Sequence, residues 1–228
     1  MNKHIVVIGA SRGIGAALVE RYAQNPQHHV YAFARDIARM KETFQAANIH
    51  CFPLDLNENI PNQLNPLLEK IPVIDVLIQN AGYLVNKPFT EISHEDFTQS
   101  YQVNVIGVME STQQLLPKLN PTGAHIVNIS SMGGFQGSMK FAGLAAYSTS
   151  KAALCSFTEM FAEEYKETPF KMNCICLGAV QTEMLAQAFP GYEAPLTPEQ
   201  MATFIVDFSL NAHRYMNGKI IPVSLTNP

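Results

Sequence analysis

Tyr147 and Lys151 form a residue pair in this sequence that could carry out acid–base chemistry. They are four residues apart, in Tyr147-Ser148-Thr149-Ser150-Lys151, at the start of a segment with a helical pattern. Positions i and i+4 share one face of a helix, so the ammonium group would lie near the phenol. A nearby cation favours the phenolate and lowers a tyrosine pKa from about 10 toward neutrality, where it can act as an acid and a base. The spacing alone also fits an ordinary solvated helix face.

A glycine-rich segment follows the first apolar run of the chain. Ile5–Ile8 leads into Gly9-Ala10-Ser11-Arg12-Gly13-Ile14-Gly15 and then into a helical pattern. Such a turn presents backbone N–H groups and a positive helix end to an anion, and it lets a pyrophosphate approach the backbone closely. The spacing is G-x-x-x-G-x-G and not the common G-x-G-x-x-G. Its position in the first strand–helix unit nevertheless favours a dinucleotide site over a purely structural turn.

The same letters match G-x-S-x-G, the nucleophile elbow of α/β-hydrolases. Ser11 would be the nucleophile, and Asp207 and His213 follow in the chain order that hydrolases use. A hydrolase oxyanion hole, however, takes a donor from an earlier strand–helix loop, and no strand precedes Ile5–Ile8. The elbow also leaves Gly15 unexplained. The hydrolase is therefore the weaker hypothesis.

Short apolar runs alternate with longer amphipathic segments along the chain, and they are the elements that must position these residues. Continuously apolar strands between helices predict a parallel sheet that is covered on both faces. We therefore expect one doubly wound, Rossmann-like α/β domain over residues 1–228. The predicted strands are Ile5–Ile8, Val30–Ala34, His50–Pro53, Ile74–Ile78, His125–Ile129, Met172–Leu177 and Lys219–Val223. The predicted helices are Ile14–Ala23, Ile37–Ala46, Glu95–Leu116, Tyr147–Tyr165 and Pro198–Leu210, with start signals at Ser93 and Thr197.

Composition limits the partners of the protein. Charged residues make up 15% of the 228 positions, against about 25% in typical soluble domains, which indicates a surface partly covered by sister subunits. A net charge of −4 without a basic run gives no reason to expect nucleic-acid binding. No apolar run reaches the roughly 18 residues of a membrane span, and Arg12 interrupts the N-terminal apolar stretch. The expectation is a soluble cytoplasmic protein that does not bind membranes.

The four cysteines show no spacing typical of metal ligands, so the sequence predicts no metal site. Cys174 and Cys176 lie in an apolar run, which favours buried thiols. That usage suits a reducing compartment.

Taken in order, the motifs resemble those of the short-chain dehydrogenase/reductase family, nearly from end to end. Gly9, Gly13 and Gly15 fit its cofactor loop, Asn80-Ala81-Gly82 its N-A-G motif, and Tyr147 and Lys151 its Tyr-x-x-x-Lys pair. The resemblance implies an NAD(P)(H)-dependent oxidoreductase that interconverts a ketone or aldehyde and an alcohol. The alternative is a non-catalytic dinucleotide-binding regulator of the same fold. Such proteins commonly lose the tyrosine or the lysine, and both are present here.

The resemblance also implies four catalytic residues. Tyr147 would donate a proton to the carbonyl oxygen during reduction, and Lys151 would lower the tyrosine pKa and hold the nicotinamide ribose. Ser131, which fits the family's serine better than Ser130, would orient the carbonyl. Asn104 would anchor a water that relays protons. The bound cofactor would supply the hydride.

The family's cofactor contacts can be placed on this sequence in the same way. Asp55 would contact adenine, and Val180 and Thr182 would hold the nicotinamide carboxamide. The full set of expected cofactor-binding residues is Gly9, Ser11, Arg12, Gly13, Ile14, Gly15, Arg35, Asp55, Leu56, Asn80, Ala81, Gly82, Tyr147, Lys151, Val180 and Thr182.

Arg35 is the expected selector between the two cofactors. Dinucleotide sites place this residue about 20 positions beyond the glycine loop, and a guanidinium there pairs with the 2′-phosphate of NADP(H). Arg12 supplies a second cation, so NADP(H) is predicted to be preferred over NAD(H). Asp36 could instead bind a free ribose, but it precedes Ile37–Ala46 and is better explained as that helix's N-cap.

The sequence departs from the family pattern near the expected substrate site. Gln79 replaces the first asparagine of N-N-A-G, and Leu177-Gly178 replaces Pro-Gly. Residues 182–196 form a short expected lid, so the substrate stays open. Glu95–Leu116 and Tyr147–Tyr165 resemble the helices through which this family forms dimers and tetramers, which predicts a homo-oligomer, with a tetramer expected before a dimer. Lid side chains that suggest an apolar pocket are Met184, Phe189 and Tyr192.

Overall fold

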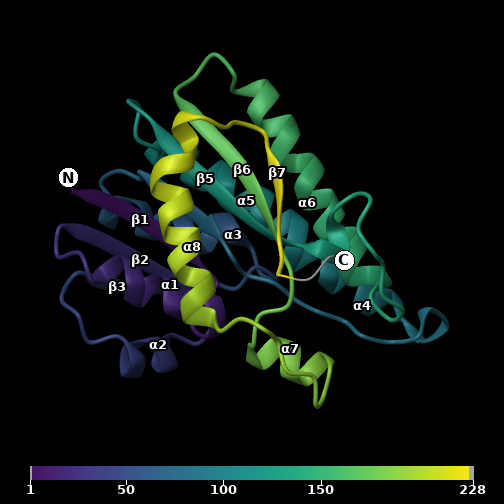
Figure 1. Cartoon of the computed structure of the whole chain (residues 1–228). Helices are drawn as coiled ribbons and strands as arrows, with labels where there is room; N and C mark the ends of the chain where they lie inside the picture. The colour runs from purple at the N-terminus through teal and green to yellow at the C-terminus, as the bar shows by residue number, and fades with distance from the viewer. Residues whose placement is uncertain (1, 226–228) are drawn as a thin grey trace.

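Seven strands form one parallel sheet with helices on both faces (Figure 1). The computed structural model describes residues 2–225, and the remaining positions of the expected domain 1–228 lie outside the described residues. The strand order β3-β2-β1-β4-β5-β6-β7 confirms the doubly wound prediction. The strands are β1 (Lys3–Ile8), β2 (His28–Ala34), β3 (Ile49–Pro53), β4 (Val76–Gln79), β5 (Ala124–Ser131), β6 (Phe170–Leu177) and β7 (Ile220–Val223).

The helices occupy the segments between the strands. They are α1 (Gly13–Ala23), α2 (Ile37–Thr43), α3 (Ile60–Leu64), α4 (His94–Tyr101), α5 (Gly107–Leu115), α6 (Ala145–Glu164), α7 (Glu183–Ala188) and α8 (Pro198–Asn211). Short 3-10 turns cover Asn65–Lys70, Phe89–Glu91, Leu116–Lys118, Met132–Gly134 and Ala212–Arg214. The start signals at Ser93 and Thr197 are confirmed, because each forms a complete capping box. α2 ends at Thr43 and not at Ala46, since Phe44 is already extended.

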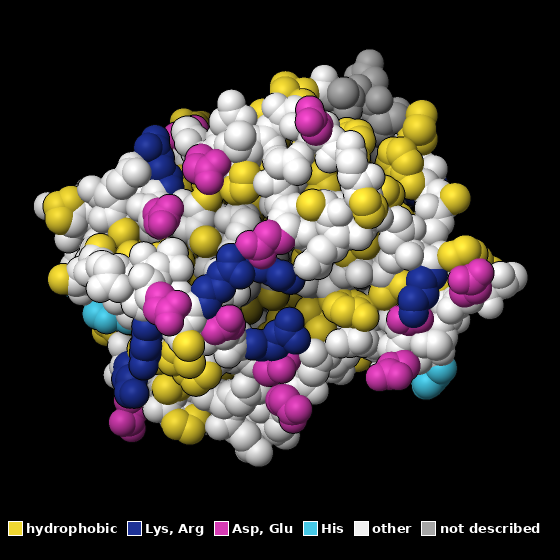
Figure 2. Space-filling view, turned by 90° about the horizontal axis from the view of Figure 1, so that it is seen from below, with side chains coloured by type: hydrophobic (Ala, Val, Ile, Leu, Met, Phe, Trp, Pro, Cys, Tyr) yellow, Lys and Arg dark blue, Asp and Glu magenta, His cyan; other side chains and the backbone are white. Residues whose placement is uncertain are grey.

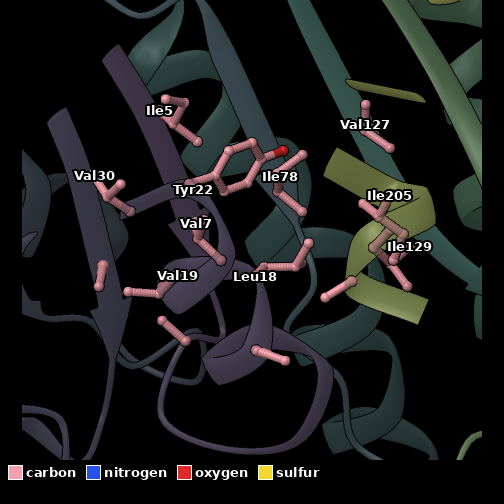
Figure 3. Close-up of a cluster of buried hydrophobic side chains, with 14 of the residues drawn as sticks. Ile5, Val7, Leu18, Val19, Tyr22, Val30, Ile78, Val127, Ile129 and Ile205 are labelled. Carbon is pink, nitrogen blue, oxygen red and sulfur yellow. The ribbon is translucent and has the colours of Figure 1, made fainter. Parts of the chain in front are cut away.

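Alternate residues of the strands pack into two separate cores, one on each face of the sheet. Val7 belongs to the core under α1 and α8. Figure 3 shows it in the same cluster of buried side chains as Leu18 of α1 and Ile205 of α8. Its neighbour Ile8 belongs to the core on the opposite face, together with Leu64 of α3. Both faces are thus covered, as the continuously apolar strands require.

The prediction of one continuous α-helix over Glu95–Leu116 is wrong for the middle of that segment. α4 and α5 are separated by one turn of π-helix, Gln102–Ile106, which contains Asn104. Such turns insert an extra residue into a helix and are frequent at functional sites.

No helix within residues 2–225 has the length and the apolar character that spanning a bilayer requires.

Candidate active site

A cavity of about 810 Å³ opens where the strands end. Ile8, Ala34 and Leu177, which stand at the carboxyl ends of β1, β2 and β6, line it. The lining includes every predicted site residue except Gly15 and Asn104. Strand order reverses between β1 and β4, and ligands of open α/β sheets bind at such a switch point. Figure 2, seen from below Figure 1, shows basic and acidic side chains gathered around a hollow in the surface.

The glycine loop is closed tightly against the start of α1. A Cβ on Gly15 would lie only 1.9 Å from the Gly9 carbonyl oxygen, so no larger residue fits there. Asn80 Nδ2 donates to that same oxygen at 2.8 Å and ties the loop to the end of β4. Within the described residues, no side chain caps α1 at Arg12. Its first N–H groups therefore remain available to an anion, which fits the pyrophosphate of a dinucleotide.

Tyr147, Lys151 and Ser131 meet at one wall of the cavity. Ser131 ends β5, and the other two lie one turn apart on α6. Lys151 Nζ donates to the main-chain oxygen of Ile129 at 2.8 Å. A Cβ on Gly134 would lie 2.6 Å from the Lys151 carbonyl carbon, so glycine allows the turn after β5 to approach α6. This close packing fixes the i and i+4 pair beside the end of the strand.

The pKa values of this group correct one expectation. Burial raises the pKa of Tyr147, and a hydrogen bond with the Ser131 side chain partly opposes the rise. The predicted lowering of the Tyr147 pKa is therefore wrong, because the effect of burial dominates. Burial also lowers the pKa of Lys151 to about 8. At neutral pH the phenol keeps its proton and Lys151 remains largely charged.

Asn104 stands behind the cavity wall and does not line it. Its Oδ1 accepts from the Tyr83 N–H at 2.8 Å, and its Nδ2 donates to Tyr83 O and to Ser150 Oγ, both at 2.9 Å. Gly82 lies between Asn104 and Lys151, because a Cβ there would lie 3.6 Å from Asn104 Oδ1 and 3.5 Å from Lys151 Nζ. Asn104 and Lys151 thus share Gly82 as a neighbour, and most of the hydrogen-bonding capacity of the Asn104 side chain is already used.

The residues expected around the adenosine half lie together at the ends of β2 and β3. Arg35 is exposed at the cavity and, within the described part of the chain, its guanidinium has no hydrogen-bond or ion-pair partner. Asp36 caps α2, with its Oδ1 accepting from the Arg39 N–H at 2.9 Å, as predicted. Asp55 lines the cavity while its Oδ1 accepts from the Asn57 N–H at 2.9 Å.

Two charged residues of this region were missed from the sequence. Arg39 of α2 donates to Glu183 of α7 at 2.7 Å, and Arg12 donates to the same carboxylate at 3.4 Å. Both arginines line the cavity beside Arg35. The contact joins residues 144 positions apart, so no local pattern could have revealed it.

The expected lid 182–196 is an excursion whose two ends are joined. Val180 and Leu196 form an isolated bridge, and the Gln181 N–H donates to Leu196 O at 2.8 Å. Thr182 caps α7, the only helix of this excursion in the described chain. The apolar side chains expected to line a pocket do line the cavity: Met184, Phe189 and Tyr192.

The hydrolase triad is not assembled. Ser11 lines the cavity at the carboxyl edge of the sheet. The His213 ring lies 5.5 Å from that of His125, which stands at the start of β5, on the opposite edge. Ser11 and His213 are therefore separated by the length of the strands.

Comparison with known proteins points to one family. A family model described as short chain dehydrogenase matches residues 3–193. An uncharacterised oxidoreductase of Staphylococcus saprophyticus is 30% identical, with 97% of each chain covered. The 3-oxoacyl-[acyl-carrier-protein] reductase of Aquifex aeolicus is 28% identical over 96% of this chain and 94% of its own. A short chain dehydrogenase of Shigella flexneri, solved in complex with NADP, superposes with a TM-score of 0.87 at 28% identity, over 97% of this chain and 96% of that one.

Proposed function

The chain belongs to the short-chain dehydrogenase family, and we propose that it reduces an apolar ketone or aldehyde with Tyr147 as proton donor. The observation that carries this proposal is the meeting of Tyr147, Ser131 and Lys151 at one wall of the cavity whose other wall is the glycine loop. An acid within reach of a bound carbonyl is the requirement of such a reduction.

The ionisation of the site favours the direction of reduction. Because burial raises the Tyr147 pKa, the phenol carries its proton at neutral pH and can give it to a carbonyl oxygen. The Ser131 hydroxyl would hold that oxygen, since Ser131 lines the same wall of the cavity as Tyr147. Lys151 would stabilise the phenolate left after transfer, as the buried cation one helical turn away.

The cavity fits a nicotinamide dinucleotide. The uncapped start of α1 and the missing side chain at Gly15 provide the cradle for its pyrophosphate, and Val180 and Thr182 would hold the nicotinamide end. When bound, this group supplies the hydride. Asp55 and Leu56 would flank the adenine.

The role proposed for Asn104 is positional. Both protons of its Nδ2 are already donated, so a relay water could bind only to the remaining lone pair of Oδ1 or to the main chain of the π turn. Asn104 therefore holds Tyr83, and through it the segment that follows Gly82, against the catalytic lysine.

NADP(H) is the proposed cofactor. Arg35, unpaired in the described structure, together with Arg12 and Arg39, offers three guanidinium groups to a 2′-phosphate. Asp36, the alternative ribose ligand, is already used as the N-cap of α2.

A homo-oligomer, either a dimer or a tetramer, is the proposed assembly. Large apolar side chains are exposed along α4, the π turn and α6: Tyr101, Ile106 and Met160. Light scattering at micromolar concentration should give a multiple of 25.2 kDa, and a monomer would contradict the proposed assembly.

The proposed location is a reducing compartment such as the cytoplasm. All four cysteines are free, which agrees with such a compartment.

The activity is tested with a panel of carbonyl compounds and both reduced cofactors. The panel should span short and long aliphatic ketones, aldehydes, aromatic ketones and 3-oxoacyl thioesters. Cofactor oxidation that depends on one of these classes and is lost in Tyr147→Phe supports the proposal. Tight cofactor binding without turnover of any class would favour the non-catalytic regulator.

A further inference from the structure

Three cysteine thiols from α6 and β6 lie close together behind the cavity wall that Tyr147, Lys151 and Ser131 form. Cys155 of α6 lies with its Sγ 3.6 Å from that of Cys176 and 3.9 Å from that of Cys174, both of β6. The three sulfur atoms all lie within 4.8 Å of one another, and all three residues are buried. Cys174 and Cys176 share a face of β6 because they are two residues apart.

This spacing is the one that a cation with three sulfur ligands requires. With metal–sulfur bonds of about 2.3 Å in a plane, the sulfurs would stand about 4.0 Å apart. The observed separations of 3.6 and 3.9 Å lie close to that value, so the ligands need to move little.

The side chains around the three thiols indicate which cation would bind there. Within the described chain no His, Asp, Glu or further Cys completes the cluster, so a fourth protein ligand of these types is missing. Tetrahedral zinc sites normally have four ligands, whereas soft thiolate and thioether ligands select Cu(I). Met132, whose side chain carries a thioether, packs in the same buried cluster.

Ser130 links the cysteine cluster to the active-site cavity. Ser130 lines the large cavity, and its Oγ lies 3.6 Å from Cys155 Sγ. The same hydroxyl donates to the main-chain oxygen of Lys151 at 2.8 Å. The Ser130 side chain therefore contacts both the cavity and the cluster.

We propose that Cys155, Cys174 and Cys176 form a binding site for one soft monovalent cation, Cu(I), directly behind Ser130 and the main chain of Lys151. Binding replaces thiol protons by the metal, so those protons are released to solvent and no electron is transferred. The sequence does not reveal this site, because Cys155 reaches the other two only when α6 packs on β6. The proposal does not depend on the oxidoreductase activity.

The test is a competition for Cu(I) between the purified protein and a coloured Cu(I) chelator, without oxygen. The native protein should remove one equivalent of Cu(I) per chain from the chelator. Cys51→Ala is the matched control, because Cys51 is a free cysteine on β3, outside the cluster, and it should bind like the native protein. Cys155→Ala and Cys176→Ala should each bind at least about 100-fold more weakly, since loss of a ligand exceeds the loss of an outer-shell partner.

X-ray absorption of the loaded native protein tests the site without a variant that could misfold. A copper environment of three sulfur atoms, with no nitrogen or oxygen, is expected. Failure of the native protein to compete, equal affinity in Cys155→Ala, loss of binding in Cys51→Ala or a copper shell with nitrogen or oxygen would each overturn the proposal.

Discussion

Polar side chains at the two edges of the sheet have opposite environments: they are buried and hydrogen-bonded at the amino edge, and they face the cavity at the carboxyl edge. At the amino edge, His125 of β5 is 1% exposed, donates from Nδ1 to Ser209 O at 2.8 Å and accepts at Nε2 from Asn173 Nδ2 at 2.9 Å. At the carboxyl edge, the same strand ends in Ser131, which faces the cavity near Tyr147. The polar group at the start of β5 thus has its hydrogen-bond partners inside the protein, whereas the one at its end faces the cavity.

The difference follows from what covers each edge. α8 and the turn Ala212–Arg214 pack around His125, so every polar atom of its ring must find a partner inside the protein. The carboxyl edge is left open by the reversal of strand order between β1 and β4. Polar groups at this edge are therefore available for hydrogen bonds to a ligand. Changes at the first edge should therefore alter stability, and changes at the second should alter activity and binding.

Apart from the loss of the Tyr147 phenol itself, Lys151→Ala should have the largest effect, and the effect should be on function. We expect turnover to fall at least about 100-fold and cofactor affinity about 10-fold or more, since the residue is assigned to both. Steady-state kinetics and cofactor titration measure the two losses. Lys166→Ala, an exposed lysine shortly after α6, is the control and should change neither. Native-like turnover in Lys151→Ala would remove the lysine from the mechanism.

His125 should make stability depend on pH. Burial lowers its pKa in the folded protein to about 4, against 6.5 for an exposed histidine. The unfolded chain therefore takes up a proton first, and stability that is complete above about pH 6.5 is lost as the pH falls toward 4. The difference corresponds to about 3 kcal/mol at the acid end. Chemical denaturation between pH 4 and 7 should show a smaller loss in His125→Gln, and identical slopes would show that other groups govern it.

Arg35→Ala should separate the two cofactors. Loss of a charged hydrogen-bonding partner should weaken NADPH binding by about 10- to 100-fold and leave NADH binding nearly unchanged. Arg21→Ala is a matched control, since Arg21 is an exposed arginine of α1 whose partner is Gln24. Titration of each protein with both cofactors decides the question. An equal loss for both cofactors would mean that Arg35 does not recognise the 2′-phosphate.

Glu183→Gln should have the smallest effect, and in the opposite direction. Its carboxylate now pairs with Arg12 and Arg39, and exposed ion pairs contribute about 1 kcal/mol at most. Freeing both arginines should strengthen NADPH binding by up to about 5-fold, without a change for NADH. Glu193→Gln, in the same lid, is the control. Weaker NADPH binding in Glu183→Gln would indicate that the carboxylate orders the arginines instead of competing for them.

Features encoded by neighbouring residues were predicted from the sequence, whereas features made by distant contacts were not. The glycine loop and the Tyr147/Lys151 pair follow from short spacings, and the strands from apolar runs. The π turn at Asn104 has no local signal, because its sequence fits an α-helix equally well. The contact between Arg39 and Glu183 and the convergence of Cys155 on β6 exist only after the elements pack.

The raised Tyr147 pKa has the same origin as the missed contacts. Spacing placed a cation near the phenol, but it could not show that Lys151 Nζ bonds to Ile129 O or that packing around the half-buried Tyr147 would raise its pKa. Desolvation depends on the whole fold, and here it outweighs the expected effect of the charge.

The most direct test of the central claim is the kcat of Tyr147→Phe, measured together with its Kd for the cofactor. The variant lacks only the phenolic oxygen, so the glycine loop and Lys151 remain as they are. We predict a kcat that is lower by about 10²- to 10⁴-fold with a Kd for the cofactor that is nearly unchanged. A variant that reduces the native enzyme's substrate with native kcat would show that Tyr147 is not the proton donor.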